Sequence, residues 1–393
     1  MRSKKICSYI LISSLFFFTC LYGQPSGWQG KTEIKKNIHY IYNPKQGLWD
    51  DDPSKKITLE KRFSIGYYEG PEDYLFTSVR DVIIDSNGRI IVLDKDCVRI
   101  FDQSGTHILT FGSEGEGPGE FKIPQGMALD DNGNIYIYDS ILQRVSVFDS
   151  GGKFIRSIRL NDRMFGKIGL KSNHDIVLSR MILFDPRMPD QFKDHKLIRL
   201  YNQKGKKLGS FFETELIVNK GPFGREQFSW CCFQLLKGDT LIGGYNYPYK
   251  IHFFDPNNKL FKIIQRESPI FSKPSLLSSQ MKMMDGNIFE TKALALRASI
   301  WDIFVLPDGK FFVYIKDNGP DYKEHFAKNA LGSQEGTMVL DLYDKNGYFL
   351  KSYPYDNYMY GKIKLVDAEG YLYTGMGPSE IVPGVTKWKI AFE

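Results

Sequence analysis

The sequence contains few residues of the types that most quickly reveal chemistry. Only five of its 393 residues are cysteine, and three of these, Cys97, Cys231 and Cys232, lie beyond the first 23 residues. An odd number of cysteines, two of them adjacent, gives no disulfide framework, so free thiols are the expected state. The sequence also lacks a Gly-x-Ser-x-Gly nucleophile motif.

An excess of one charge is lacking as well. The formal net charge is +6, from 52 Lys and Arg against 46 Asp and Glu. Arg2, Lys4 and Lys5 lie in a segment that we expect to be removed, which leaves about +3 (6 − 3). This small excess gives no reason to expect nucleic-acid binding through bulk charge.

One apolar run has the layout of a sorting signal. Residues 6–22 follow three basic residues and precede Gly23 and Gln24, which is the three-part pattern of a secretory signal. The run is too short for a good membrane span, although a retained anchor is the alternative. We expect residues 1–23 to be a signal peptide, and the protein to be periplasmic, on the cell surface or extracellular. Lipidation of Cys20, and a membrane tether through it, stays open because Phe17-Phe18-Thr19 is a poor lipoprotein box.

Aromatic residues are plentiful, and they occur in a repeat. Residues 79–112 read VRDVIIDSNGRIIVLDKDCVRIFDQSGTHILTFG, and residues 124–158 read PQGMALDDNGNIYIYDSILQRVSVFDSGGKFIRSI. The positions that recur 45 residues later are Asp85 as Asp130, Gly88 as Gly133, and Asp94 as Asp139. Repeats of this period indicate stacked units.

Each unit predicts four short antiparallel strands. Four runs rich in Val, Ile, Tyr and Phe are separated by turn residues. DSNG and DDNGN follow the first run, where Asn and Gly supply the positive φ angles of a tight hairpin. A single four-stranded meander cannot bury both faces, so neighbouring units must pack together.

Weaker copies of the unit continue to the end of the chain. Residues 165–211, 231–264 and 300–353 hold three more, and residues 361–392 hold a sixth that lacks its fourth strand. Residues 56–66 have the pattern of the missing strand. We predict that this segment completes the last unit and closes a ring, which removes the open sheet edges.

The glycine-rich stretch SEGEGPGEF, residues 113–121, lies between two units. It is echoed by residues 64–76, and in degraded form by residues 218–228. No Lys-Ser or Lys-Thr follows it and its charges are negative, so a phosphate-binding loop is disfavoured. We interpret it as a linker between units.

These motifs closely resemble NHL-type six-bladed β-propellers, and more narrowly a secreted bacterial family called 6-bladed beta-propeller proteins. The stretches GSEGEGPGEFKIPQGMALDDNGNIYIYD, RVSVFDSGGKFIRSI and DVIIDSNGRIIVLD carry the likeness, which is specific over residues 57–160. The resemblance implies an all-β, six-bladed propeller over residues 56–393, preceded by an N-terminal extension over residues 24–55. It implies little about function, because propellers host lyases, lactonases, receptors and scaffolds.

Loops between second and third strands share one propeller face with the inter-blade linkers. Insertions at residues 180–195, which begin with Arg180, and at residues 316–337 fall in such loops. A third insertion, residues 265–299, is predicted to hold a short helix near residues 291–298. Insertions that gather on one face indicate the binding face.

The corresponding loop of blade four, YNYPYK, carries three tyrosines. Tyr245, Tyr247 and Tyr249 suit sugar rings or peptide side chains, or they pack under the neighbouring insertion. Lys250 and Arg144 hold matching positions before third strands. They could hold a carboxylate or phosphate, or they could simply be solvated.

Asp94 and Asp139 end the second strands of two blades. They could form part of a carboxylate ring that faces a cation or a basic ligand. The alternative is that each accepts backbone N–H groups in its own loop. Ser179 and Gly244 stand at this position in other blades, which favours the second interpretation.

The histidines do not converge on a metal site. Only His195 and His325 lie in loops of the candidate face, and His252 is expected to point outward from a third strand. We therefore expect an exported, non-catalytic binding propeller without cofactor or metal, with a carbohydrate, peptide or protein ligand. A metal-assisted enzyme, resembling an amidating lyase or a lactonase, is the alternative.

Overall fold

The structure is a computed structural model that describes residues 24–160, 166–182, 195–215, 229–282, 288–324, 336–375 and 383–393. The predicted signal peptide with Cys20 lies outside these residues. So do His325, the linker copy at residues 218–228, and most of the insertion at residues 180–195.

Six blades, each with four consecutive antiparallel strands at its centre, account for most of the described chain; five are four-stranded sheets, and blade four is part of a seven-stranded sheet. Blade one contains β4 (Val79–Ile84), β5 (Ile90–Asp94), β6 (Cys97–Phe101) and β7 (His107–Phe111). Blade two contains β8 (Pro124–Leu129), β9 (Ile135–Asp139), β10 (Arg144–Phe148) and β11 (Phe154–Arg159). Blade three contains β12 (Ile168–Leu170), β13 (Ile176–Ser179), β15 (Lys196–Tyr201) and β16 (Lys207–Glu213).

The second half of the ring has the same plan. Blade four contains β17 (Ser229–Leu235), β18 (Leu241–Tyr245), β19 (Lys250–Phe254) and β20 (Leu260–Arg266), and the two-residue β14 (Met181–Ile182) pairs with β17. Blade five contains β23 (Ala298–Val305), β24 (Phe311–Asp317), β25 (Thr337–Tyr343) and β26 (Phe349–Tyr355). Blade six contains β27 (Lys362–Val366), β28 (Tyr371–Gly375), β29 (Val385–Phe392) and β3 (Ile57–Ile65).

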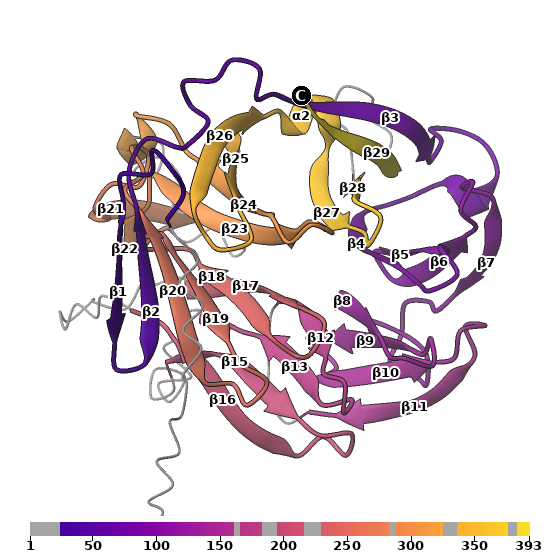
Figure 1. The fold of residues 1–393 in the computed structure, drawn as a ribbon. Coiled ribbons are helices and arrows are strands. Elements are labelled where there is room, and N and C mark those ends of the chain that lie inside the picture. The colour runs from indigo at the N-terminus through magenta and orange to yellow at the C-terminus, as the bar shows by residue number, and fades with distance from the viewer. Residues whose placement is uncertain are drawn as a thin grey trace, which may run out of the picture.

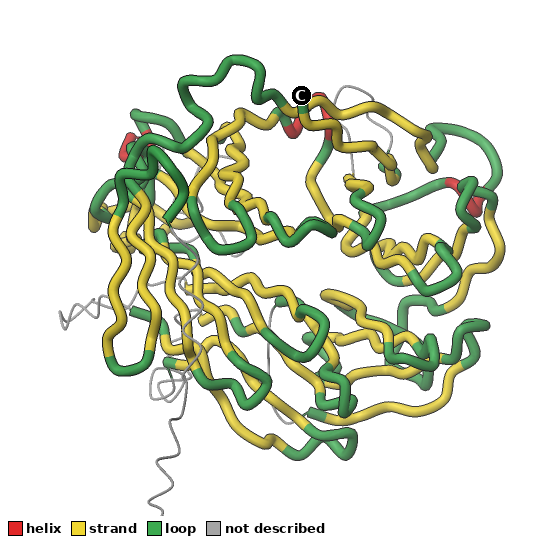
Figure 2. Tube along the Cα trace, viewed as in Figure 1, coloured by secondary structure: helices red, strands yellow, loops and turns green. Residues whose placement is uncertain are grey.

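The six sheets stand around a common centre, with the first strand of each blade innermost (Figure 1). Among the described residues, helix is limited to short segments such as η1 (Glu72–Tyr74) and α2 (Asn357–Tyr360) (Figure 2). The predicted all-β, six-bladed propeller is confirmed. No described helix is long and apolar enough to cross a membrane.

The repeated Asp-x-x-Gly turns form as the sequence predicts. The Asp85 Oδ1 atom accepts hydrogen bonds from the backbone N–H groups of Asn87 and Arg89, at 3.0 and 2.8 Å. Gly88 has a φ of 75°, a left-handed conformation that favours glycine. The carboxylate therefore takes up N–H groups that a tight turn leaves unpaired.

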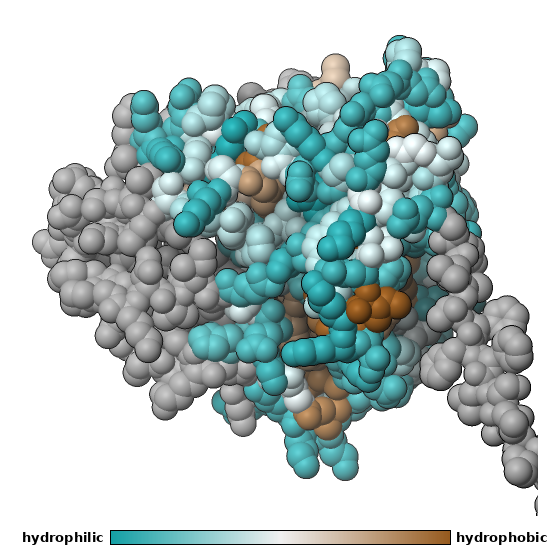
Figure 3. Space-filling model, turned by 60° about the vertical axis from the view of Figure 1, so that its left-hand side comes forward, coloured by the Kyte–Doolittle hydropathy of each residue, from teal (hydrophilic) through white to brown (hydrophobic). Residues whose placement is uncertain are grey.

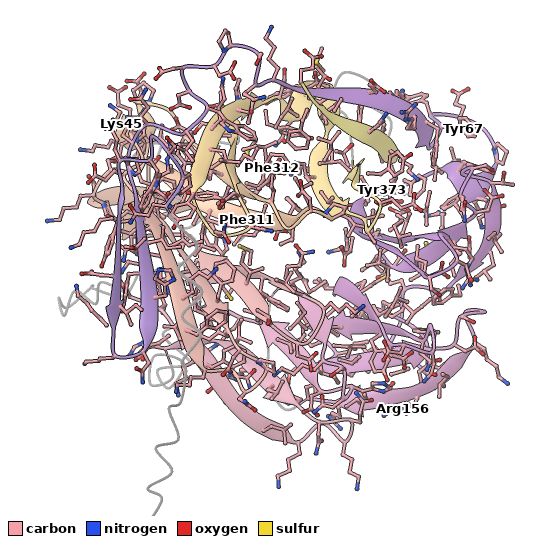
Figure 4. All side chains as sticks on the ribbon, viewed as in Figure 1. Lys45, Tyr67, Arg156, Phe311, Phe312 and Tyr373 are labelled. Carbon is pink, nitrogen blue, oxygen red and sulfur yellow. The ribbon has the colours of Figure 1, made fainter. Side chains whose placement is uncertain are left out.

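The core lies between blades, because both faces of each sheet are apolar. Phe311 and Phe312 are consecutive on β24 and point to opposite faces (Figure 4). Phe311 packs toward blade four beside Phe253, with ring centroids 6.1 Å apart. Phe312 packs toward blade six, where its ring stacks on Phe392. Burying both side chains stabilises the contacts between blade five and its two neighbours.

The ring closes as predicted. Strand β3 pairs antiparallel with β29 from Ile57↔Phe392 to Ile65↔Val385. Ile65 is 2% exposed and packs into the core between blades six and one. The N-terminal part of the described chain thus supplies the outermost strand of the last blade.

The segment before β3 has an ordered place that the sequence did not reveal. Strands β1 (Lys31–Lys35) and β2 (Ile38–Asn43) form a hairpin, and β2 pairs parallel with β20 to extend blade four outward (Figure 1). The chain then crosses the edge of blade five, where the Trp49 N–H donates to the Leu350 carbonyl at 2.9 Å. Residues 24–65 therefore form a belt that touches blades four, five and six in turn.

Asn43 fastens this belt. Its buried side chain accepts from Trp28 Nε1 at 3.0 Å and from the Phe349 N–H at 2.8 Å. Its Nδ2 donates to the Gly347 carbonyl at 2.9 Å. One amide thereby joins the hairpin to a turn of blade five.

The helix predicted near residues 291–298 is absent, and that prediction is wrong. Strands β21 (Ser275–Lys282) and β22 (Ile288–Ala295) form a two-stranded hairpin instead, followed at once by β23. The Ala- and Leu-rich composition favours helix locally, but pairing with a neighbouring strand overrides propensity.

Candidate functional site

A groove of about 990 Å³ opens where the hairpin meets blade four. Three segments line it: the hairpin β1–β2, the loop after β18, and the connection after β20. The loop after β18 is the predicted YNYPYK loop. The side of the molecule that carries the hairpin is largely hydrophilic, with small hydrophobic patches (Figure 3).

The three predicted tyrosines have different environments. Tyr245 is fully buried and packs on Phe212 and His252. Tyr249 is 4% exposed, whereas Tyr247 is partly exposed and lines the groove beside Pro248, to which it is joined by a cis peptide bond. Of the three rings, that of Tyr247 is therefore the one that a ligand in the groove can contact most fully.

Buried charge organises the floor of the groove. Asp341 on β25 is fully buried, and its Oδ2 atom accepts from Arg266 Nη1 and, at 2.7 Å, from the Tyr249 hydroxyl. Its Oδ1 atom accepts from the Ser352 hydroxyl. Burial and, next, the Asp341 carboxylate raise the pKa of Tyr249 well above its usual value. Tyr249 and Arg266 both line the groove, so a residue of blade five positions two groups of the site.

Arg266 joins the connection after β20 to the segment that follows the hairpin and to blade five. Its guanidinium stacks 3.6 Å from the centre of the Phe349 ring and donates to the Lys45 carbonyl at 3.1 Å. Burial opposes its charge, but the Asp341 carboxylate raises the pKa of Arg266 above its ordinary value. The guanidinium therefore stays charged at the base of the groove, and Asp341 balances its charge.

The hairpin forms the opposite wall. The Tyr42 hydroxyl donates to Glu33 Oε1, and the Tyr42 ring stacks on Tyr40 with centroids 6.0 Å apart. Hydrogen bonds from Lys35 and then from Tyr42 lower the pKa of Glu33 to about 2. Tyr42 lines the groove and is partly exposed, so it gives the site a second accessible ring.

The groove carries a positive charge excess. Its lining includes five cationic side chains: Lys31, Lys35, Lys45, Lys250 and Arg266. Against them stand the lining residues Glu33 and Glu267 and the paired carboxylates Glu215 and Asp341, which leaves an excess of one positive charge (5 − 4). Lys250 pairs with Glu215 across the loop. Lys45 is exposed where the chain leaves the hairpin (Figure 4). An acidic ligand is therefore favoured over a basic one.

The other predicted site residues lie away from the groove. Asp139 accepts backbone N–H groups of Lys122 and Ile123, at 2.7 and 3.0 Å, and of its own loop. Asp94 likewise accepts from the N–H groups of Thr77 and Ser78, at 3.0 and 2.6 Å, and it pairs with Arg99. Both carboxylates thus anchor the chain that enters a blade.

Arg144 holds the linker itself. Its guanidinium donates to the backbone carbonyls of Glu116, Gly117 and Glu120, at 3.0, 2.6 and 2.8 Å. The stretch SEGEGPGEF lies between β7 and β8, as predicted for an inter-blade linker. Arg180 is 5% exposed, and its backbone N–H group donates to the Leu197 carbonyl at 2.7 Å.

One histidine prediction is wrong. His252 does not point outward; it is 5% exposed and packs against Phe212, Tyr245 and Phe254. Burial, and then the charge of Lys250, lower the pKa of His252 to about 3. Among the described residues, no three His, Cys, Asp or Glu side chains are grouped so that they could hold a metal ion.

Comparison with known proteins agrees with this architecture. Residues 49–175 match the sequence profile of the family described as 6-bladed beta-propeller. The chain is a six-bladed β-propeller. A 48-residue stretch, 12% of this propeller, is 46% identical to Protein lin-41 of Caenorhabditis elegans, and the match spans 4% of that protein.

Two solved structures share the fold. A member of the DUF4221 family from Bacteroides vulgatus superposes with a TM-score of 0.56 at 13% identity, over 86% of this propeller and 100% of that chain. A Bacteroides fragilis protein that is predicted to be exported superposes with a TM-score of 0.56 at 12% identity, over 90% of this propeller and 99% of that chain. Likeness at such low identity shows the fold alone.

The sequence did not predict that the hairpin β1–β2 forms one wall of the groove. The composition of IHYIYN is typical of a strand, but nothing local shows that β2 pairs with β20, more than 200 positions away. The one available signal was the aromatic and basic content of residues 31–45, which matches that of the tyrosine loop.

Proposed function

We propose that this propeller is an exported, non-catalytic binding protein that recognises an acidic carbohydrate or peptide in the groove beside blade four. The observation that carries the proposal is the meeting of the YNYPYK loop with the belt hairpin in one open groove. Two partly exposed tyrosine rings, Tyr42 and Tyr247, face a lining with excess positive charge.

The chemistry of the lining supports a binding role. Partly exposed tyrosine rings offer an apolar face and a polar edge, which suits sugar rings and peptide side chains. The exposed Lys45 offers a partner to a carboxylate or sulfate, whereas Arg266 is buried and paired with Asp341 and supports the site from below. The volume of about 990 Å³ is at the upper end of the range for pockets that enclose a small ligand.

Export is supported chiefly by the N-terminal sequence, and a protein that shares the fold is consistent with it. The first 23 residues have the charge and hydropathy layout of a secretory signal. A protein of the same fold from Bacteroides fragilis is predicted to be exported. The described chain forms no disulfide, since Cys97, Cys231 and Cys232 are all free thiols, which is compatible with export but does not require it.

Replacing Tyr247 with alanine tests the proposal. Glycan and peptide arrays probed with the wild-type protein should give hits that Tyr247→Ala weakens by about tenfold or more, because a stacked aromatic ring often carries 1–2 kcal/mol or more of binding energy. The matched control is Tyr358→Ala, which removes a ring that is 59% exposed on α2 and should leave binding unchanged.

The choice of variant follows from burial. Tyr245 and Tyr249 are buried, so their replacement would disturb folding and confuse the readout. If the arrays give hits whose affinities are equal in wild type, Tyr247→Ala and Tyr358→Ala, the groove is not the recognition site.

A further inference from the structure

The centre of the ring contains a second cavity, separate from the groove. It measures about 180 Å³, and the innermost strands of all six blades, or the residues next to them, line it. These strands, β4, β8, β12, β17, β23 and β27, surround the centre of the view in Figure 1. The cavity has room for about six water molecules, or for one compact ion with some of its water.

Ionisable side chains from several blades meet at this cavity. The Lys167 ammonium of blade three lies 3.2 Å from both carboxylate oxygens of Asp302 in blade five. In blade one, the Asp81 carboxylate accepts the N–H groups of Val82 and Met127, at 3.0 and 2.8 Å. Asp81, Asp302 and Lys167 are thus each bonded to a residue of another blade.

Lys364 of blade six is differently placed. It lines the cavity, and the described residues give its ammonium one hydrogen bond, to the Arg80 carbonyl at 3.1 Å. No described carboxylate lies within ion-pair distance of it. An ammonium has three donors, so at least one is available to a ligand in the cavity.

More cations surround Lys364 than the carboxylates can balance. Burial lowers the pKa of Lys364 most, the carboxylates of Asp81 and Asp302 oppose this effect, and the charges of Lys362 and Arg80 lower the pKa further. Among the described residues around the cavity, four cations (Arg80, Lys167, Lys362 and Lys364) therefore stand against two carboxylates (Asp81 and Asp302).

We propose that the central cavity binds one compact oxyanion group, a carboxylate or phosphate, held by Lys364 and attracted by the neighbouring cations. A cleft with low-dielectric walls concentrates the field of such a cluster. The ion would take up the donors of Lys364 that the protein leaves unpaired and would offset the excess of positive charge. This site shares no residue with the groove, so the proposal stands or falls independently of the proposed function.

The test is isothermal titration of the purified protein with inorganic phosphate at low ionic strength. We expect saturable binding to one site and a loss of affinity of about tenfold or more in Lys364→Met, since a charge-assisted hydrogen bond is lost. Lys153→Met removes the same charge from an exposed turn between β10 and β11 and should bind as the wild type does. Circular dichroism shows whether each variant is folded.

Two further arms complete the design. Adenosine 5′-monophosphate has a body too large for the cavity: equal affinity would show that the group enters at the tip of a larger ligand, and weaker binding would show a free ion. Lys362→Gln changes an exposed residue, so it is expected to fold and to weaken phosphate by a smaller factor. The proposal is overturned if wild type gives no saturable binding, or if Lys364→Met and Lys153→Met bind phosphate equally.

Discussion

Replacing Asp341 with alanine is expected to lower the free energy of unfolding by about 3–5 kcal/mol, because it leaves the Arg266 guanidinium buried without a counter-charge. Asp341 is 1% exposed and Arg266 is 5% exposed, measured on their side chains. The substitution also removes the acceptor of the Tyr249 and Ser352 hydroxyls. Urea denaturation followed by tryptophan fluorescence measures the effect.

Two variants separate the causes of this loss. Ser352→Ala removes a single hydrogen bond to Asp341 and should cost about 1 kcal/mol. Adding Arg266→Met to Asp341→Ala removes the orphaned charge, so the double variant should be more stable than Asp341→Ala alone. If the losses of unfolding free energy in Asp341→Ala and Arg266→Met simply add in the double variant, the ion pair does not organise this part of the core.

The same network connects stability with the site. Tyr249 and Arg266 line the groove and both bind Asp341, so Asp341→Ala should weaken ligand binding as well as folding. Tyr247 faces the groove and is not part of this network. Its replacement should therefore affect binding while leaving the free energy of unfolding within about 1 kcal/mol of wild type.

A disulfide between β3 and β29 should form spontaneously and stabilise the ring by up to about 5 kcal/mol. The hydroxyls of Ser64 and Thr386 lie 2.9 Å apart although the residues are 322 positions apart in the chain. The variant Ser64→Cys/Thr386→Cys places two thiols within bonding reach. The effect is large because the bond closes most of the chain into one loop, which restricts the unfolded state.

The native thiols should not interfere with the formation of this disulfide. Burial is the main cause that raises the pKa of Cys97 to about 11 and that of Cys232 to about 12, and thiols with such values form little thiolate at neutral pH. The control pair Ser64→Cys/Lys389→Cys is out of register, since Lys389 pairs with Glu60. Peptide mapping should find the 64–386 bond and no 64–389 bond. The opposite pattern would mean that the closing strand has another register.

The blades could be predicted because their signals are local. Asp-x-x-Gly turns and alternating apolar runs each act over a few positions, and together they defined four strands per unit. Their repetition after 45 residues showed that the units recur along the chain. Ring closure followed from counting, since the sixth unit lacked a strand and residues 56–66 supplied one. The structure confirms both.

The groove could be predicted only in part, because it depends on long-range pairing. The sequence singled out Tyr245, Tyr247 and Tyr249 as equivalents, but Tyr245 at the end of β18 and Tyr249 directly before β19 are both buried in the core. The partner wall, Tyr42 with its neighbouring lysines, belongs to a hairpin whose place is set by pairing with β20. Periodicity gives the type of an element but not its neighbour in space.

Hydrogen–deuterium exchange with and without a saturating array-derived ligand tests the central claim, that the groove beside blade four is the recognition site. The account predicts slower exchange at the two walls of the groove, in peptides covering residues 29–45 and 245–271, and unchanged exchange in blades one and two. Protection confined to other blades, with both walls of the groove exchanging as in the free protein, would contradict it.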